Sequence, residues 1–347
     1  MHLSPHLPRR GLLAATAVAT ITLATACGSP QPEVVGSARV STLADTKRAA
    51  QLTYDFGDTA YAPPGLGGKR MELRASVTYP RQPGSEKHPL ALMLHGWGTA
   101  TCQTGDQPAR ARSWPCGKDA KPVDNYLGYS YLAEALAEKG YVVVSVSANG
   151  IQAQEKNEGH IARAALLDKH LELWQQLSQG KGPLAELKQF TGRVDLGRVG
   201  TMGHSRGGGG VLAQALDSHK PPAGVTIRGT LAFAPAMNGI DPARERITRV
   251  PVSVVVGTCD AMWEKTVVPG AEQHDLPGAN HNFFNTVWTP GTGPAFAMDD
   301  VAVEKRNRPG GQCETTNGTG TVRQLTPAEQ RKAALDLTTT FFTKHLG

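Results

Sequence analysis

The sequence predicts an α/β protein with a mostly parallel central sheet and helices on both of its faces. Two observations support this fold class. Short apolar runs alternate along the chain with segments of helical period, which is typical of strand–helix–strand units in a parallel sheet. One apolar run also leads through a glycine-rich stretch, residues 201–210, into a helical pattern, and the other elements can be arranged around this turn.

The expected elements follow in chain order. Residues 52–56 and 71–79 are expected to be opening strands, antiparallel because little chain separates them. Further strands are expected at 89–95, 141–147, 195–202, 229–233 and 252–256, and helices at 129–139, 160–177, 211–216 and 326–345. The last helix should begin at Thr326 and Pro327, because Glu329 stands at capping-box spacing.

Residues 203–207 read GHSRG and fit the pattern G-x-S-x-G. In this motif a strand turns sharply into a helix and strains the serine backbone, so the residues two before and two after must be small. Gly203 and Gly207 meet that requirement. Ser205 is then expected at a helix N-terminus, where backbone N–H groups favour developing negative charge. The alternative is a tight turn in which the serine only caps the helix.

A serine hydroxyl is a poor nucleophile at neutral pH, so it needs an adjacent base that is oriented by an acid. The histidines after Ser205 are His219, His274, His281 and His345. We expect the base to be His281, because it lies in a polar loop ahead of the last helix. His274 is the second candidate, although it is expected in a short strand before that loop.

The acid is expected directly after a strand. Asp260 follows the apolar run 252–256 and is the candidate. It has an alternative interpretation as a helix N-cap, and Asp241 and Asp275 are the other candidates.

Acyl transfer also needs N–H donors for the oxyanion of the tetrahedral intermediate. One is expected from the backbone of Arg206, directly after the nucleophile, and the second from Trp97 in the loop 94–99. His95 is expected to organise that loop. The expected substrate-binding residues are Trp97, Met237, Asn238 and Trp263.

The histidine–glycine loop at residues 95–96, the GHSRGG elbow, the acid after Val-Val-Val-Gly and the late histidine resemble the α/β-hydrolase superfamily over about residues 50–345. The elbow is similar to those of secreted actinobacterial polyester hydrolases and cutinase-like esterases, with dienelactone-hydrolase relatives close by. The sequence departs from these patterns in three ways. Polyester hydrolases carry Met where this chain has Arg206, and an aromatic residue in the loop that here reads APAMN at 234–238. Dienelactone hydrolases use cysteine as the nucleophile, which Ser205 excludes.

Together, the residues and the resemblance predict a serine esterase that acts through an acyl-enzyme and needs no metal ion or organic cofactor. The expected substrate is a small or polymeric ester, and we expect a monomer. An acyltransferase or a cofactor-free perhydrolase would use the same triad. A catalytically inactive surface-binding lipoprotein with the same fold is the alternative from another class.

The N-terminus resembles an export signal. Arg9 and Arg10 precede an uncharged apolar stretch, residues 11–26, and the paired arginines suggest the twin-arginine route. Cys27 is expected to be lipidated as in bacterial lipoproteins, although Leu23 stands four residues before it rather than three. A tether is expected at 27–48, and the mature protein is expected to be secreted or held at the cell surface.

The remaining 321 residues are enough for one large domain, expected at 49–347. Removing residues 1–26, which hold two arginines and no acid, lowers the formal charge from +6 to +4. So small a charge over this length, with no basic run, argues against a nucleic-acid partner.

Four cysteines besides Cys27 allow three disulfide connectivities. We favour Cys102–Cys116, which closes a short polar loop, and therefore Cys259–Cys313 by elimination. A zinc site is the competing interpretation, but the cysteine and histidine spacings do not support it.

Residues 285–324 form a long segment rich in Gly, Pro, Asn and Thr. It is expected either to fold over the site as a rim, with Trp288 and Phe296 as apolar contacts, or to be a disulfide-tethered surface excursion.

Overall fold

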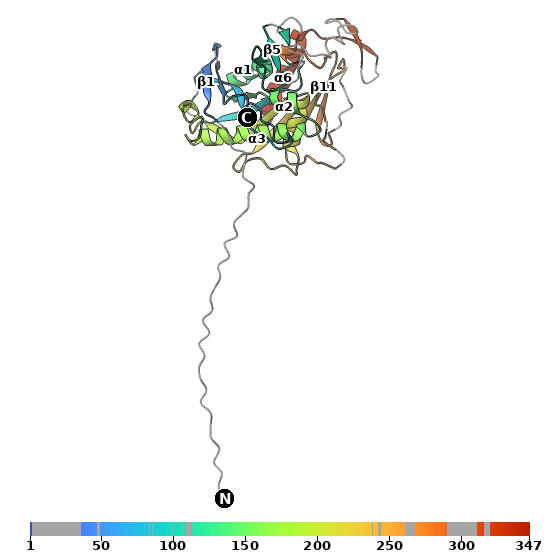
Figure 1. The fold of residues 1–347 in the computed structure, drawn as a ribbon. Coiled ribbons are helices and arrows are strands. Elements are labelled where there is room, and N and C mark those ends of the chain that lie inside the picture. The colour runs from blue at the N-terminus through green and yellow to red at the C-terminus, as the bar shows by residue number, and fades with distance from the viewer. Residues whose placement is uncertain are drawn as a thin grey trace. The chain divides into compact units, whose positions relative to one another are not determined.

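The described residues contain a nine-stranded sheet at the centre of the structure (Figure 1). This computed structural model describes Met1 and residues 36–347, apart from 47–48, 83, 85, 99, 106, 109–112, 238, 242–243, 261–267, 290–310 and 316–319. The described residues from 36 onwards belong to one compact unit.

The strands of the central sheet are β1 (Arg39–Thr42), β2 (Ala49–Asp55), β3 (Arg74–Pro80), β4 (His88–Leu94), β8 (Val142–Val146), β9 (Val194–His204), β10 (Ile227–Phe233), β11 (Val252–Gly257) and β12 (Glu272–Leu276). Their order across the sheet is β1-β2-β3-β8-β4-β9-β10-β11-β12. The six strands from β8 to β12 in this order are parallel, and β3, β2 and β1 continue the sheet antiparallel.

The helices are α1 (Ser130–Glu138), α2 (Asn149–Gln154), α3 (Gly159–Ser178), α4 (Arg206–Ala215) and α6 (Pro327–Leu346), with 3-10 turns η1 (Asn125–Tyr129), η2 (Lys188–Phe190) and η3 (Thr286–Trp288). Two short sheets lie outside the central one: β5 (Cys102–Thr104) with β6 (Gln107–Pro108) and β7 (Lys121–Pro122), and β13 (Gln312–Glu314) with β14 (Thr321–Arg323). No helix among the described residues is both long enough and apolar enough to cross a membrane.

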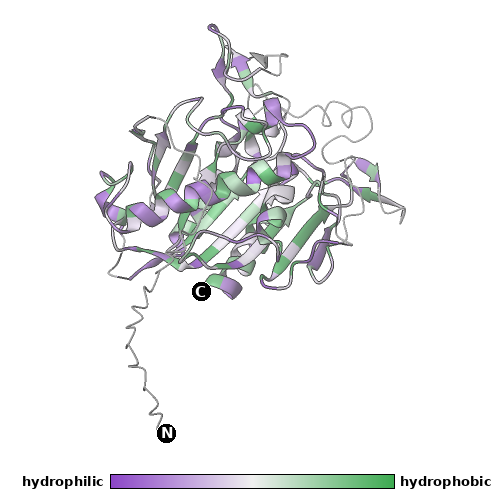
Figure 2. Ribbon diagram, turned by 60° about the horizontal axis from the view of Figure 1, so that its bottom comes forward, coloured by the Kyte–Doolittle hydropathy of each residue, from purple (hydrophilic) through white to green (hydrophobic). Residues whose placement is uncertain are grey.

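Helices cover both faces of the sheet because both faces are apolar. Successive strand residues point to opposite faces, and β4 shows the result. Leu92 packs in a buried cluster with Leu167 of α3, whereas its neighbour Met93 packs in a second cluster with Leu136 of α1 and Phe342 of α6. Figure 2 shows the strands mainly in green and white, with purple mainly on helices and connecting segments. The predicted α/β class, mostly parallel with helices on both faces, is confirmed.

The individual elements also agree closely with the expectations. The opening strands are antiparallel, and α6 has the predicted capping box, in which Thr326 and Glu329 bond each other's backbone N–H. Two predictions need correction. The expected tether extends to residue 48, but residues 39–42 form β1, where Arg39 pairs with Asp55 at 3.1 Å. The helix expected at 211–216 begins five residues earlier, directly after Ser205, and its first turns consist of glycines, which are poor helix formers and therefore gave no helical pattern.

Both predicted disulfides are present, Cys102–Cys116 and Cys259–Cys313. The second joins the chain after β11 to β13, and so ties the long segment 285–324 to the body of the protein.

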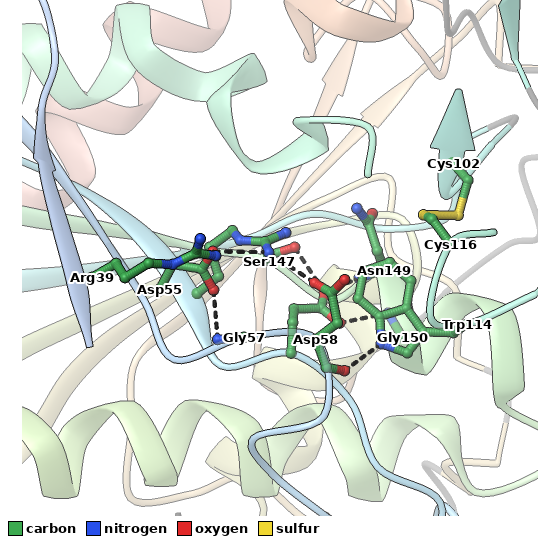
Figure 3. A network of polar contacts seen from close by, with 12 residues as sticks. Arg39, Asp55, Gly57, Asp58, Cys102, Trp114, Cys116, Ser147, Asn149 and Gly150 are labelled. Carbon is green, nitrogen blue, oxygen red and sulfur yellow. Dashed lines mark hydrogen bonds and ion pairs between the residues drawn. A yellow bond between two sulfur atoms is a disulfide. The ribbon is translucent and has the colours of Figure 1, made fainter. Parts of the chain in front are cut away.

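A buried carboxylate fixes the start of α2 (Figure 3). Glu72 accepts hydrogen bonds from the Ser147 hydroxyl and the Asn149 N–H, both at 2.7 Å, and from the Gly150 N–H at 2.9 Å. Burial raises the pKa of Glu72, and the hydrogen bonds from Ser147 and Gly150 act against that rise. Trp114 lies beside Gly150 (Figure 3), where a Cβ would collide with Met71, with Glu72 and with the Trp114 indole nitrogen. The helix that precedes residue 155 is therefore held in one position.

Candidate active site

The predicted site residues gather at one edge of the sheet. Strands β4, β9, β10, β11 and β12 are parallel, so their carboxyl ends lie at the same edge. Trp97 follows β4, Ser205 follows β9, Asp260 follows β11 and His281 follows β12. Ligands of open α/β sheets bind at this edge.

Ser205 has the strained backbone that the motif predicts. Its φ is 57° and its ψ is −123°, a left-handed conformation that costs a non-glycine residue about 1–3 kcal/mol. The strain is held by hydrogen bonds from the Ser205 N–H to the Phe233 carbonyl and from the Ala236 N–H to the Ser205 carbonyl, both at 2.9 Å. The hydroxyl makes no capping hydrogen bond to α4, so the alternative interpretation as a helix cap is not supported.

The glycines of the elbow allow close approach on every side. A Cβ on Gly203 would collide with the Gly207 carbonyl, as the motif requires. At residues 207–210, Cβ atoms would collide with the end of β4, with the loop after β10 or with α3. Helix α4 therefore packs with its backbone against its neighbours, which brings Ser205 into the middle of the site.

His281 and Asp260 form a buried pair. His281 Nδ1 lies 2.8 Å from Asp260 Oδ2, and the residues are 9% and 1% exposed. The other candidate histidines lie elsewhere: His219 pairs with Asp168 at 2.7 Å, His274 is in β12, and His345 stacks on α6. Of the four candidates, His281 is thus the one that the fold pairs with the predicted acid.

His204 links this pair to the elbow. Its Nε2 donates to the His281 carbonyl at 2.8 Å, and the Tyr129 hydroxyl donates to its Nδ1 at 3.0 Å. Burial lowers the pKa of His204 well below its usual value, so the ring is neutral and this tautomer fits both partners. The ring centroids of His204 and His281 are 5.1 Å apart. Since His204 precedes Ser205, the elbow and the histidine loop are fixed to one another.

Helix α6 also holds the histidine loop. Gln330 bonds both the N–H and the carbonyl of Asn280, at 2.9 Å and 2.8 Å. The Asn280 side chain in turn accepts from the N–H groups of Asn282 and Phe283. These bonds fix the backbone of the polar loop that carries His281.

The loop after β4 is fixed by buried side chains. His95 Nδ1 donates to the Gly96 carbonyl at 2.8 Å, and its Nε2 accepts from the Ala148 N–H at 2.8 Å. Burial lowers the pKa of His95 to about 4, so it stays neutral. Gln152 of α2 donates to the Gly98 carbonyl at 2.7 Å. His95 therefore organises this loop as expected.

The two expected oxyanion donors come from segments in contact. A Cβ on Gly96 would lie 2.5 Å from the Ser205 Cβ and 2.9 Å from the Arg206 backbone nitrogen. Only glycine allows the residue before Trp97 to approach the elbow this closely. The backbone of Trp97 therefore begins beside Ser205 and the Arg206 N–H.

The Arg206 side chain makes two specific contacts. Its guanidinium carbon lies 4.3 Å from the Trp97 ring centroid, within the range of a cation–π contact. Its Nη1 donates to Glu155 Oε1 at 2.7 Å. Arg163 of α3 binds the same carboxylate through both of its terminal nitrogens, at 2.5 and 3.2 Å. These charges hold the pKa of Glu155 below its usual value despite its burial.

Sequence reasoning missed several of these residues. Glu155, Arg163, Tyr129 and Gln330 carry no motif and are joined to the site only by the tertiary fold. His204 stands inside the elbow motif, so its position next to Ser205 was the one available signal.

Some predicted residues are placed differently or not described. Met237 is half-buried and packs against the buried cluster that contains Leu92 and Leu167. Asn238, Trp263, Phe296 and Cys27 lie outside the described residues. Trp288, expected as an apolar contact if the long segment folds over the site, is buried, and its ring centroid lies 4.8 Å from that of His204. Its indole N–H donates to the Asn125 side chain at 2.8 Å, which explains why the ring turns inward.

Comparisons with protein-family models and with curated proteins find no match for this chain.

Proposed function

We propose that this protein is a serine esterase with the α/β-hydrolase fold, in which Ser205, His281 and Asp260 form the catalytic triad. The observation that carries the proposal is the buried 2.8 Å contact between His281 and Asp260, in a loop that His204 ties to the elbow. A carboxylate that accepts the Nδ1 proton of an imidazole leaves Nε2 free to act as a base.

The chain order supports the same assignment. In α/β hydrolases the nucleophile follows a central parallel strand, and the acid and the histidine follow later strands in that order. Here Ser205 follows β9, Asp260 follows β11 and His281 follows β12, all at one edge of the sheet. The strained φ of Ser205 supports a nucleophile elbow, because such strain persists mainly at functional sites.

In the proposed reaction the Ser205 oxygen attacks the ester carbonyl carbon while His281 Nε2 accepts the hydroxyl proton. Collapse of the tetrahedral intermediate breaks the bond to the alcohol oxygen, and His281 returns the proton to the leaving alcohol. A water molecule then attacks the acyl-enzyme with His281 again as base, which releases the carboxylic acid and restores the serine. Asp260 keeps the imidazole in the required tautomer throughout.

The negative oxygen of the intermediate would be held by the backbone N–H groups of Trp97 and Arg206. The contact between Gly96 and the elbow supports this role, because it brings the two segments together. Each such donor contributes about 2.7–4 kcal/mol to lowering the barrier.

We also propose that the esterase works outside the cytoplasm. The predicted signal at residues 1–26 lies outside the described residues, so this part rests on the sequence and on the two disulfides, which persist in oxidising compartments. Fractionation of cells that express the full chain, with Arg9 and Arg10 each replaced by lysine as the comparison, tests export.

The test of the triad is covalent labelling with a fluorophosphonate, followed by hydrolysis of p-nitrophenyl esters of graded chain length. The wild-type protein should be labelled at Ser205 and should release p-nitrophenol. Ser205→Ala should abolish both, with unchanged circular dichroism. Ser178→Ala is the matched control, because that hydroxyl bonds only within α3 among the described residues. Labelling that persists in Ser205→Ala would place the nucleophile elsewhere.

A further inference from the structure

The cationic side chain of Arg206 lies directly beside the proposed nucleophile. It extends from the first residue of α4, one position after Ser205, and its guanidinium stacks on Trp97. The side chain is 25% exposed, so its charge is only partly hydrated. Stacking on Trp97 and bonding to Glu155 hold it in one orientation.

The charge of Arg206 is not fully neutralised. Glu155 is 6% exposed and supplies one negative charge, while Arg163 is 1% exposed and binds both carboxylate oxygens. In this bidentate pair the charge of the Arg163 guanidinium is balanced by the charge of the Glu155 carboxylate. Arg206 shares only Oε1, and no other carboxylate among the described residues lies within ion-pair distance of it. The cluster of Arg206, Arg163 and Glu155 therefore carries a surplus positive charge.

The surplus charge faces the site through Arg206 rather than Arg163. Arg163 is closed off by Glu155 and by the glycine face of α4, where a Cβ on Gly210 would collide with its side chain. Arg206 has Nε and Nη2 donors that no described residue occupies. A planar guanidinium with free donors is well suited to binding a carboxylate or another planar anion.

The support beneath Arg206 is rigid. Glu155 directly follows α2, whose first N–H groups are held by buried Glu72 (Figure 3). Gln152 of the same helix also bonds the loop that carries Trp97. Both partners of Arg206 are therefore fixed by one helix, which lowers the cost of ordering the guanidinium when a ligand binds.

We infer that Arg206 binds an anionic group of the substrate, so that the preferred substrates are esters carrying a carboxylate near the scissile bond. This inference rests on the proposed esterase function and names its substrate class. The carboxylate belongs either to the acyl part or to the alcohol part of the ester, and the experiment below separates the two.

The test compares matched esters that differ only in charge. In the acyl arm, the mono-p-nitrophenyl ester of adipic acid is compared with its methyl-ketone analogue of equal length. In the alcohol arm, p-acetoxybenzoate is compared with p-acetoxyacetophenone. Each kcat/KM is divided by the rate constant for hydroxide, which removes differences in intrinsic reactivity. The wild-type enzyme should prefer the anionic ester by about tenfold or more in one arm.

The variants are Arg206→Gln, Arg206→Lys and Arg228→Gln. Arg206→Gln should lower the anionic-to-neutral ratio about tenfold, and Arg206→Lys should retain part of the preference, because lysine keeps the charge but loses the planar fork. Arg228→Gln removes the same charge from the exposed amino end of β10, at the opposite edge of the sheet, and should leave the ratio unchanged. Rising salt should reduce the wild-type ratio, a readout that needs no variant to fold.

The outcomes separate this inference from the proposed function. If Ser205 is labelled and the neutral esters are hydrolysed, but neither arm favours the anion, the inference about Arg206 is wrong and the esterase stands. The same conclusion follows if the ratio is unchanged in Arg206→Gln. If Ser205 is not labelled and no ester is hydrolysed, both proposals fail.

Discussion

Replacing His204 with phenylalanine is expected to destabilise the protein and to impair catalysis together. The change keeps a ring of similar size against His281 and Trp288 but removes both ring nitrogens. The His281 carbonyl loses its donor and the Tyr129 hydroxyl loses its acceptor. A buried polar group left unpaired costs about 1–3 kcal/mol, so the loss for two groups is about 2–6 kcal/mol.

The pairing with Tyr129 makes this number testable by a double-mutant cycle. Tyr129→Phe alone leaves His204 Nδ1 without its donor and should cost about 1–2 kcal/mol. In the double variant neither orphaned atom of that hydrogen bond remains. Its cost should therefore be smaller than the sum of the single costs by about 1–2 kcal/mol.

Urea unfolding at fixed pH measures the free energy of unfolding of each variant, and the kinetics of p-nitrophenyl ester hydrolysis measure kcat/KM. We expect His204→Phe to lower kcat/KM by about 100-fold, because the histidine loop loses its link to the elbow. The matched control is the buried pair His170 and Tyr54, in which a tyrosine hydroxyl lies 2.7 Å from a histidine Nδ1 away from the site. The control cycle should show the same coupling in stability and no loss of activity.

If the losses of stability in the two single variants add up, within about 0.5 kcal/mol, to the loss in the double variant, the hydrogen bond between Tyr129 and His204 is refuted. Equal losses of activity in His204→Phe and His170→Phe would show that the catalytic effect is only a consequence of destabilisation.

Three further predictions follow from the site. Asp260→Asn should lower kcat about 10⁴-fold in ester kinetics, because an amide N–H facing Nδ1 forces the His281 imidazole into the wrong tautomer. The control is Asp275→Asn, at an exposed position in β12, which should retain full activity. Gly96→Ala should abolish labelling by a fluorophosphonate, since its Cβ would lie 2.5 Å from the Ser205 Cβ; a labelled, fully active variant would contradict the packing. Between pH 7 and pH 4 the free energy of unfolding should fall by about 3 kcal/mol because of His95 alone. The pKa of His95 is about 4 in the folded state and about 6.5 in the unfolded state, so in this pH range the unfolded state binds more protons. Urea unfolding across this pH range measures the total decrease, to which buried His170 and His204 also contribute, and His95→Asn should make that decrease smaller by about 3 kcal/mol.

Much of the fold could be predicted because its strands have simple patterns. The valines of β8 and β11 form continuous apolar runs, which a strand buried on both faces requires. The pairing of His281 with Asp260 was predicted because the histidine lies in a polar loop ahead of the last helix and the acid directly follows an apolar strand. In contrast, β1 is short and mostly exposed, so no apolar pattern distinguishes it from a tether.

The charged support of the site could not be predicted for a different reason. Glu155 and Arg163 flank the start of α3, and they reach Arg206 only because the glycine face of α4 packs against that helix. Local sequence does not encode such a contact between helices. For Trp288 the sequence left two alternatives open, a contact over the site or a place in a surface excursion, because the partners of its ring and indole N–H lie far away in the chain.

The close packing of residues 207–210 limits how this protein can change over evolution. Every one of these glycines is surrounded so tightly that adding a single methyl group forces neighbouring chain to move. Residue 206 is the one position in the first turn of α4 that extends a side chain toward the site. Selection for new substrates would therefore act on that side chain and on the loops around it, and mutant libraries directed at the glycines should return almost no active clones.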